Sequence, residues 1–290
     1  MAERLTVTRT YKLFIGGKFP RTESGRSFPV HNRRDKVIAH ACRASRKDLR
    51  NAVVAARAGQ PGWADAPAYL RGQILYRMAE MMEGKSEEFA SLLAATVPGG
   101  MRRARKEVTA AIDRLVTFAG WADKFAQVLG CNNPIAGPFY NFTTPEAVGV
   151  VGVIAPEEEP LLGLISLLAP PLCAGNAVIA LGSEAHPLAT SVLGEVCATS
   201  DVPAGVVNLL TGYREELVPQ FASHRNIDAV HAAGLSRSEM VTLREGVAEN
   251  LKRVTLRKPA ADDWYSDDCE GPWWIEPFVE MKTVWHPVGA

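Results

Sequence analysis

Residues 148–155, with the sequence VGVVGVIA, form a nearly continuous apolar run, which predicts a β-strand that is buried on both faces. Four similar runs follow at 176–181, 206–210, 227–232 and 252–257. Each gap between consecutive runs has room for one helix. Buried strands that alternate with helices predict a parallel sheet covered on both faces. Right-handed crossovers make this layout doubly wound and Rossmann-like, so we expect an α/β fold.

The chain before this sheet is predicted to contain a hairpin and several helices. Residues 11–19, YKLFIGGKF, place two apolar runs around Gly16-Gly17, a turn pair that tolerates positive φ. A second extended piece is expected near Phe28–His40. Apolar residues at helical spacing predict the helices, with Ser45 as a candidate N-cap of the first. The helices are expected near 45–58, 68–96 and 104–128.

Two segments that lie far apart in the sequence have the character of a β arm. Residues 126–146 are turn-rich and carry aromatic side chains, which predicts a hairpin. Residues 279–285, VEMKTVW, predict one further strand. Before that strand, residues 258–278 mix acids, prolines and tryptophans without a usable period. We expect an irregular linker over those residues.

The composition narrows the possible classes of function. The chain has 290 residues, and its 32 basic and 32 acidic residues give a formal net charge of zero. Without a basic excess, we expect neither nucleic acid nor a membrane surface as a partner. The N-terminus lacks the apolar core of a signal peptide, and no apolar run is long enough to span a bilayer. The five cysteines form no CxxC pair, so we expect a cytoplasmic protein without a metal site.

Several runs together resemble the aldehyde dehydrogenase superfamily, and they follow one another in the family's own order. The resemblance covers residues 11–257 and 279–286, and it depends on order and spacing more than on any single run. The runs are FIGGKF (14–19), EAVGVVGVIAP (146–156), LAPPLCAGNAVIALGSE (168–184), VPAGVVNLLTG (202–212) and NLKRVTL (250–256).

The resemblance implies a nucleotide-binding domain, a catalytic domain with a nucleophilic cysteine, and a small three-stranded oligomerisation sheet. We expect the first as a discontinuous domain of residues 1–125 and 147–257, and the oligomerisation arm at 126–146 and 279–290. Only residues 258–278 stand where the resemblance implies the catalytic domain, and so short a segment cannot form an α/β domain. The catalytic domain is therefore expected to be absent.

The positions that the resemblance assigns to catalysis carry unsuitable residues. Glu158 stands where the family has an asparagine that donates to the oxyanion, and its carboxylate would repel the developing charge. Arg257 stands at the position of the general base, yet arginine keeps its proton near neutral pH. Cys269 lies in the irregular segment among acidic neighbours, which disfavour a thiolate. We expect no catalytic residue, with Glu158 and Arg257 vestigial, and hence a pseudoenzyme and not an enzyme.

Three consecutive glutamates, residues 157–159, leave two interpretations open. One is a paired-carboxylate acid–base site. The other, which we prefer, is a solvated acidic turn over a vacant cleft, or a contact with a basic partner.

The residues that the resemblance assigns to NAD are only partly kept. Arg214 stands where a second glycine is usual. Ser236 and Glu239 form a capping box that would satisfy the helix N-terminus on which a pyrophosphate normally rests. We expect no cofactor, with NAD binding as the alternative. The vestigial cofactor-binding positions are Glu184, Gly212 and Gly234.

The arm implies a partner, because unpaired sheet edges are an aggregation hazard. We expect this chain to be a non-catalytic subunit that docks on a full-length aldehyde dehydrogenase and stabilises or regulates it. In this it is similar to the second, truncated module of double-module aldehyde dehydrogenases. The alternatives are a self-associating homodimer, a residual NAD-binding sensor, and an active NAD-dependent aldehyde oxidoreductase.

Overall fold

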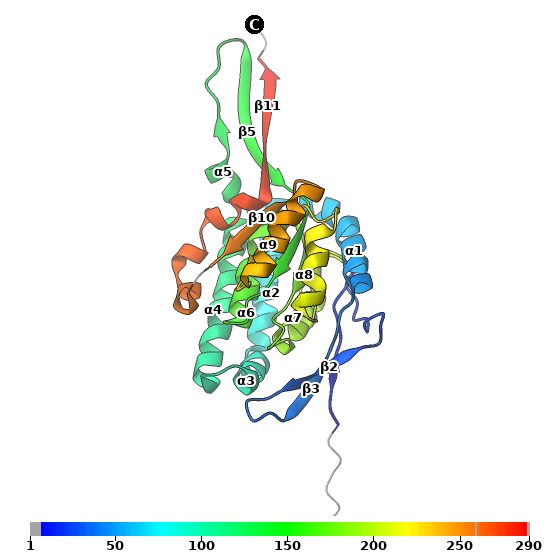
Figure 1. Cartoon of the computed structure of the whole chain (residues 1–290). Helices are drawn as coiled ribbons and strands as arrows, with labels where there is room; N and C mark the ends of the chain where they lie inside the picture. Colours follow the sequence, from blue (N-terminus) through cyan, green and yellow to red (C-terminus); the bar gives the residue numbers. More distant parts are fainter. Residues whose placement is uncertain (1–6, 259, 289–290) are drawn as a thin grey trace, which may run out of the picture.

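A computed structural model describes residues 7–258 and 260–288, and its centre is a five-stranded parallel sheet of order β10-β9-β6-β7-β8 (Figure 1). This confirms the predicted doubly wound α/β sheet. The chain starts the sheet at β6 and adds β7 and β8 on one side, then β9 and β10 on the other. The point where the strand order reverses therefore lies between β6 and β9. The strands are β6 (Val150–Ile154), β7 (Ala177–Leu181), β8 (Val207–Leu210), β9 (Ala229–Ala233) and β10 (Arg253–Arg257).

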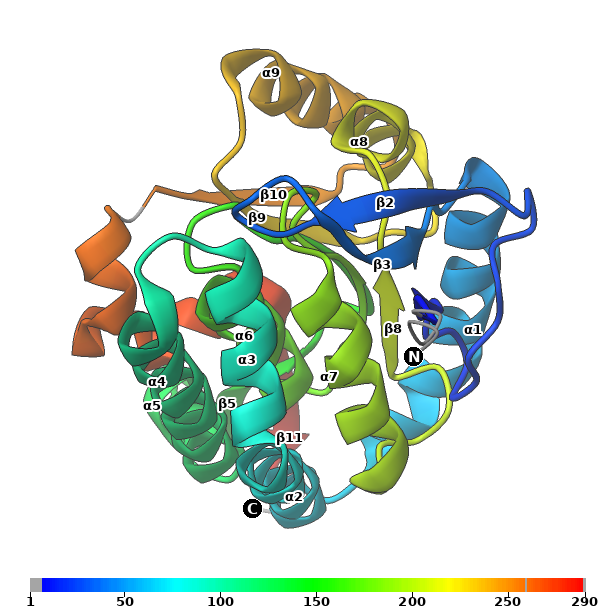
Figure 2. The same ribbon diagram turned by 90° about the horizontal axis from the view of Figure 1, so that it is seen from below.

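Helices cover both faces of this sheet, as the apolar strands require (Figure 2). One hydrophobic cluster lies under α2 (Ala68–Gly84), α3 (Ser86–Thr96), α4 (Gly100–Trp121), α6 (Pro160–Cys173) and α7 (Leu188–Thr199). The other lies under α1 (Arg46–Asp65), α8 (Arg214–Ser223) and α9 (Arg237–Glu245). No helix in the described part of the chain is long and apolar enough to cross a membrane.

The N-terminal region differs from the sequence prediction in its element boundaries. The extended piece expected at Phe28–His40 is two antiparallel strands, because Asn32 turns the chain by accepting from the backbone N–H groups of Arg34 and Lys36. The helix expected over 68–96 breaks at Lys85, and the helix expected over 104–128 starts four residues earlier and ends before a short α5. The elements are β1 (Thr10–Tyr11), β2 (Ser27–His31), β3 (Val37–Cys42) and α5 (Phe125–Leu129).

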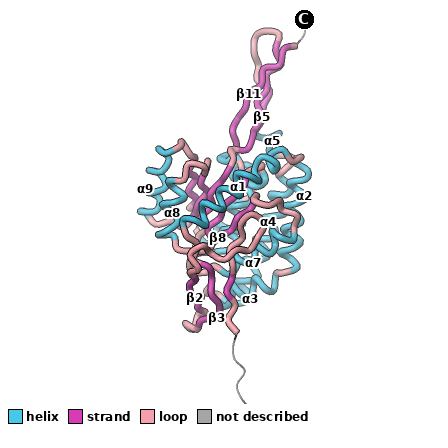
Figure 3. The backbone as a smooth tube through the Cα atoms, turned by 90° about the vertical axis from the view of Figure 1, so that its right-hand side faces the viewer, coloured by secondary structure: helices cyan, strands magenta, loops and turns pink. Residues whose placement is uncertain are grey.

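The predicted arm is a separate three-stranded antiparallel sheet that projects from the body (Figures 1 and 3). Its strands are β4 (Cys131–Asn132), β5 (Phe139–Ala147) and β11 (Val279–Pro287), in the order β11-β5-β4. Nine residues of β11 pair with nine of β5, from Val279 opposite Ala147 to Pro287 opposite Phe139. The prediction that the two distant segments pair with each other is confirmed.

The segment expected to be an irregular linker is irregular but well packed. Its described part forms the short 3₁₀ turns η2 (Ala261–Tyr265), η3 (Asp267–Cys269), η4 (Pro272–Trp274) and η5 (Glu276–Phe278). Arg114 of α4 is almost fully buried beneath it and donates to the Trp264 and Cys269 carbonyls and to the Glu270 carboxylate. Charge-assisted bonds of this kind are stronger than neutral ones, so the segment is part of the folded body.

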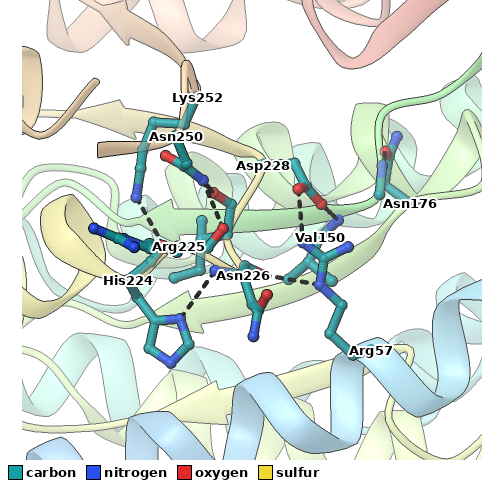
Figure 4. A network of polar contacts seen from close by, with 11 residues as sticks. Arg57, Val150, Asn176, His224, Arg225, Asn226, Asp228, Asn250 and Lys252 are labelled. Carbon is teal, nitrogen blue, oxygen red and sulfur yellow. Dashed lines mark hydrogen bonds and ion pairs between the residues drawn. The ribbon is translucent and has the colours of Figure 1, made fainter. Parts of the chain in front are cut away.

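The amino ends of the central strands are joined by a polar network (Figure 4). Asp228, just before β9, accepts from the Arg57 guanidinium at 2.6 Å and from the Val150 backbone N–H at 2.8 Å. Asn250 donates to two backbone carbonyls of the α8–β9 connection, and the buried Lys252 ammonium donates to two carbonyls at the end of α8. This network ties the start of β6 to the starts of β9 and β10.

Candidate site at the carboxyl edge of the sheet

In a doubly wound sheet, ligands bind beyond the carboxyl ends of the strands at the point where the strand order reverses. Here that point is occupied by the side chain of Arg214, the first residue of α8. Its guanidinium donates to the Ala155 carbonyl, just past β6, and to the Gly234 carbonyl, just past β9, the latter at 2.9 Å. Arg214 is buried, with 8% of its surface exposed. The arginine therefore bridges the two strands between which a crevice would lie.

Glu157 forms a second bridge over the same edge. Its carboxylate accepts from the Ser183 hydroxyl, from the backbone N–H groups of Glu184 at 3.1 Å and Ala185 at 3.0 Å, and pairs with Arg214 Nη2 at 3.1 Å. The Glu184 carboxylate in turn accepts from the Arg214 backbone N–H at 2.8 Å. The loops after β6 and β7 and the start of α8 are thus held together by carboxylates.

Glu159 is buried at the start of α6, in a left-handed backbone conformation with φ of 48° that a non-glycine residue adopts only at some cost. Its carboxylate accepts from Arg103 at 2.7 Å and from the Tyr265 hydroxyl at 2.8 Å. Next to it, the buried Glu107 carboxylate accepts from the Leu161 and Leu162 N–H groups at the α6 N-terminus. Burial and the charge of Glu159 raise the pKa of Glu107 to about 8.

The preferred interpretation of the glutamate triplet as a solvated acidic turn is therefore wrong for two of its three members. Glu158 is exposed, at a small cavity of about 190 Å³ that Gly234 and Trp264 also line. Glu157 is held in an ion pair with Arg214, and Glu159 in one with Arg103. A turn prediction gives no direction for each side chain, so the sequence could not separate the three.

Arg257, to which the resemblance gives the position of the general base, contacts His231 and the Trp274 ring. Its Nε donates to His231 Nε2 at 3.1 Å, and its guanidinium lies 4.2 Å from the Trp274 ring centroid. His231 is fully buried, with Nδ1 at 2.9 Å from the Leu167 carbonyl, and burial lowers its pKa to about 3. A neutral histidine with its proton on Nδ1 fits both contacts. Arg257 thus anchors the 3₁₀ segment to the sheet.

Three buried cysteines, Cys173, Cys197 and Cys269, lie in environments that disfavour a thiolate. Burial raises the pKa of Cys173 and of Cys197, the latter to about 12. Burial is also the main cause that raises the pKa of Cys269, while the neighbouring Asp268 contributes little. The sequence argument attributed this effect to the acidic neighbours, so it named the smaller cause. Among the described residues there is no cluster of three or more side chains that could hold a metal ion.

The predicted cofactor-binding positions lie together but serve other purposes. Glu184 and Gly234 both contact Arg214, and the predicted capping box of Ser236 and Glu239 at the start of α9 is present. Gly212 lies within contact distance of the Ala44 backbone, where a side chain would be crowded. A dinucleotide at the switch point would have to displace the Arg214 side chain and face the Glu157 carboxylate. With Arg214 and Glu157 in these positions, the crevice does not fit a dinucleotide.

Sequence reasoning identified Arg214 only as a lost glycine and did not foresee that it pairs with Glu157. The available signal was that a cation, Arg214, and an anion, Glu157, both stand in loops at the carboxyl edge of the predicted sheet. Glu107 and Arg103 carried no signal, because α4 is distant in sequence from the loop that it contacts.

Comparisons with known proteins agree on the relationship of this chain. The model of the "Aldehyde dehydrogenase family" matches residues 19–264. The cytosolic aldehyde dehydrogenase 1 of Elephantulus edwardii is 32% identical over 251 residues, covering 84% of this chain and 49% of the relative. Human retinal dehydrogenase 2 is also 32% identical, with 84% and 48% covered. The chain thus spans about half the length of these relatives.

Solved structures lead to the same group of proteins. The NAD⁺ complex of an aldehyde dehydrogenase from Bacillus cereus is 29% identical and superimposes with a TM-score of 0.81, over 86% of this chain and 51% of the other. The relatives are named as dehydrogenases and this neighbour is an NAD⁺ complex, so the expectation that the chain is not an enzyme is contradicted. The matched residues and the shared sheet make this chain a member of the aldehyde dehydrogenase family.

Proposed function

We propose that this chain is a subunit of an aldehyde-oxidising enzyme assembly, in which its arm pairs with a full-length aldehyde dehydrogenase. The observation that carries the proposal is the arm itself. Strand β11 is an edge strand of nine residues, and it stands away from the body beside β5 (Figure 3). A long edge with unpaired backbone groups is a ready template for a second chain.

The side chains of the arm support an interface with another protein. Phe139 and Tyr140 of β5 and Met281 and Trp285 of β11 are all large and exposed. Phe139 and Trp285 pack edge to face with ring centroids 5.9 Å apart, which presents a fixed aromatic surface. Exposed aromatic groups of this kind are enriched at the centres of protein interfaces.

We infer aldehyde oxidation as the reaction of this assembly, because the relatives are named as aldehyde and retinal dehydrogenases. NAD is the expected oxidant of this assembly, because a solved relative is an NAD⁺ complex. The assembly is expected in the cytoplasm. Binding of this chain is expected to stabilise the full-length subunit, because a protein that binds only the folded state of its partner raises the stability of that partner by mass action.

The test is the native mass of the tagged chain, alone and co-expressed with a full-length aldehyde dehydrogenase from the same organism. We expect a mixed complex from the wild type and loss of that complex with Trp285→Lys, which places a charge in the interface. Trp273→Lys is the matched control, because Trp273 is equally exposed, at 63% against 58%, but lies on the body. It should leave the complex intact.

Two other outcomes would replace the proposal. A stable dimer that ignores the enzyme and dissociates with Trp285→Lys would assign the same arm to a homodimer. Aldehyde-dependent NADH formation by the purified chain alone would assign the whole reaction to this chain, since the assembly would then be unnecessary for it. If the full-length enzyme oxidises aldehyde at the same rate alone and in the complex, the role of this chain is stabilisation only. The melting temperature of the full-length enzyme measures that stabilisation.

A further inference from the structure

The carboxylate of Glu157 is held the way that proteins hold a bound anion. Three donors and one cation surround it: the Ser183 hydroxyl and the backbone N–H groups of Glu184 and Ala185 donate hydrogen bonds, and Arg214 Nη2 forms an ion pair. Neighbouring backbone N–H groups and one arginine are the usual elements of a site for phosphate or carboxylate. Glu157 reaches this cradle from a different loop, so it acts as an anion brought in from outside.

The cradle has contacts that do not depend on Glu157. The Ser183 hydroxyl also accepts from the His186 backbone N–H at 2.9 Å, and the Glu184 carboxylate accepts from the Arg214 backbone N–H at 2.8 Å. The Arg214 guanidinium is independently fixed by the Ala155 and Gly234 carbonyls. These contacts hold the donors in position when Glu157 is elsewhere.

A second observation indicates that the cradle is larger than its present occupant needs. Among the residues that the structure describes, Arg214 Nε is sealed from solvent and has no hydrogen-bond partner. The Nε and Nη2 hydrogens of a guanidinium form one edge, which binds two oxygens of a carboxylate or phosphate side by side. Only Nη2 of that edge reaches Glu157. An anion with a further oxygen would satisfy Nε as well, and a buried unpaired donor is costly.

Glu157 can leave the cradle without unfolding the protein around it. Its side chain is 34% exposed, whereas that of Arg214 is 10% exposed. It lines a cavity of about 510 Å³ together with Phe28 and Tyr213, whose rings pack 5.3 Å apart. The cavity can receive the displaced carboxylate or the apolar part of a ligand.

We propose that residues 183–185 and Arg214 form an anion-binding site whose internal occupant is Glu157, and which takes the phosphate or carboxylate group of a small molecule when Glu157 turns into the adjoining cavity. The site lies beside the strand-reversal crevice and uses the Nε–Nη2 edge of the arginine that fills that crevice. One anion replaces another in the cradle, while the Glu157 carboxylate keeps its charge in the adjoining cavity. The internal carboxylate competes at a high effective concentration, so it weakens every external anion.

Inorganic phosphate and acetate are the probes, each titrated at constant ionic strength against chloride, with melting temperature and calorimetric binding as readouts. We expect Glu157→Ala to melt several degrees below the wild type and to recover with phosphate, and its affinity for phosphate to be at least about tenfold higher than that of the wild type, since the competitor is gone. A larger recovery with acetate than with phosphate would identify carboxylates as the ligand class. Glu158→Ala is the matched control, because Glu158 is adjacent and exposed, and it should not respond.

Two further variants keep the test decisive. Glu157→Gln has the shape of glutamate without its charge, so it should fold if Glu157→Ala does not, and it should still bind phosphate more tightly than the wild type. Glu157→Ala with Arg214→Lys lacks Nε and should lose the response to phosphate. The proposal is overturned if folded Glu157→Ala and Glu157→Gln ignore both anions, or if Glu158→Ala responds equally. The experiment does not involve the arm, so its failure would leave the proposed subunit role standing.

Discussion

The two edges of the central sheet are built from similar polar residues but differ in what those residues hold. At the amino edge, Asp228, Asn250 and Lys252 bind backbone groups of adjoining strands and turns (Figure 4). At the carboxyl edge, Arg214 and Glu157 bind each other and the ends of loops. The amino edge fixes the strands. The carboxyl edge keeps charged groups that can exchange partners, which is the property that a ligand site requires.

Removing Asp228 should be the most damaging change, because it breaks the amino-edge network at its centre. Asp228→Ala leaves the Val150 N–H without its partner and removes the ion pair with Arg57. We expect a loss of about 2 to 3 kcal/mol in the free energy of unfolding, since a partly buried donor is left unpaired. Urea denaturation measures it. Asp113→Ala, an exposed change on α4, should stay within about 0.5 kcal/mol of the wild type. A similar small loss for Asp228→Ala would show that the amino edge is not the rigid one.

Near the carboxyl edge, Glu107 should make the free energy of unfolding depend on pH. Burial and Glu159 raise the pKa of Glu107 to about 8 from an ordinary value of 4.5. The folded protein therefore holds a proton that the unfolded chain has released between these two values, and stability is lost as the pH rises through this window. The charged groups that face Glu107 are Glu159 and Arg103, and the Tyr265 hydroxyl from the 3₁₀ segment donates to Glu159.

Glu107→Gln tests this directly, because glutamine can still accept from the Leu161 and Leu162 N–H groups but does not ionise. Relative to the wild type, the variant should be nearly as stable at pH 5 and more stable by about 1 kcal/mol or more at pH 9. The free energy of unfolding is measured at both values. Glu83→Gln, an exposed change on α2, should show no such trend. A constant difference between pH 5 and pH 9 for Glu107→Gln would mean that the pKa of Glu107 is not raised in the folded protein.

The sequence could predict the central sheet because each strand is an apolar run of its own, as in residues 148–155. It could predict the pairing within the arm because the family resemblance supplied the distant partner strand. It could not predict the contact between Arg214 and Glu157, which depends on how two loops fold toward each other. Local pattern gives the periodicity of a strand or helix, but it gives no direction for side chains in a turn. For the same reason, the sequence could not predict that Glu159 is buried or that Tyr265, in the segment before β11, donates to it.

The smallest expected effect is at the link between the carboxyl edge and the 3₁₀ segment. Tyr265→Phe removes only the hydroxyl that donates to Glu159 at 2.8 Å, and the ring that Lys106 Nζ approaches to 3.8 Å from its centroid is kept. The loss should be about 1 kcal/mol, the net value of a typical hydrogen bond, because the Glu159 carboxylate keeps its ion pair with Arg103. Tyr69→Phe, on an exposed face of α2, is the control and should change nothing.

For Tyr265→Phe, the pH dependence of the lost stability is more informative than the amount of stability lost. Without the hydroxyl, the Glu159 carboxylate keeps Arg103 but loses its second donor, so the position of Glu159 and its effect on the pKa of Glu107 change. The pH at which stability falls should therefore shift in Tyr265→Phe, whereas a purely packing role for Tyr265 would lower stability equally at every pH. The second result would separate the segment from the carboxyl pair and confine the exchangeable charges to Arg214 and Glu157.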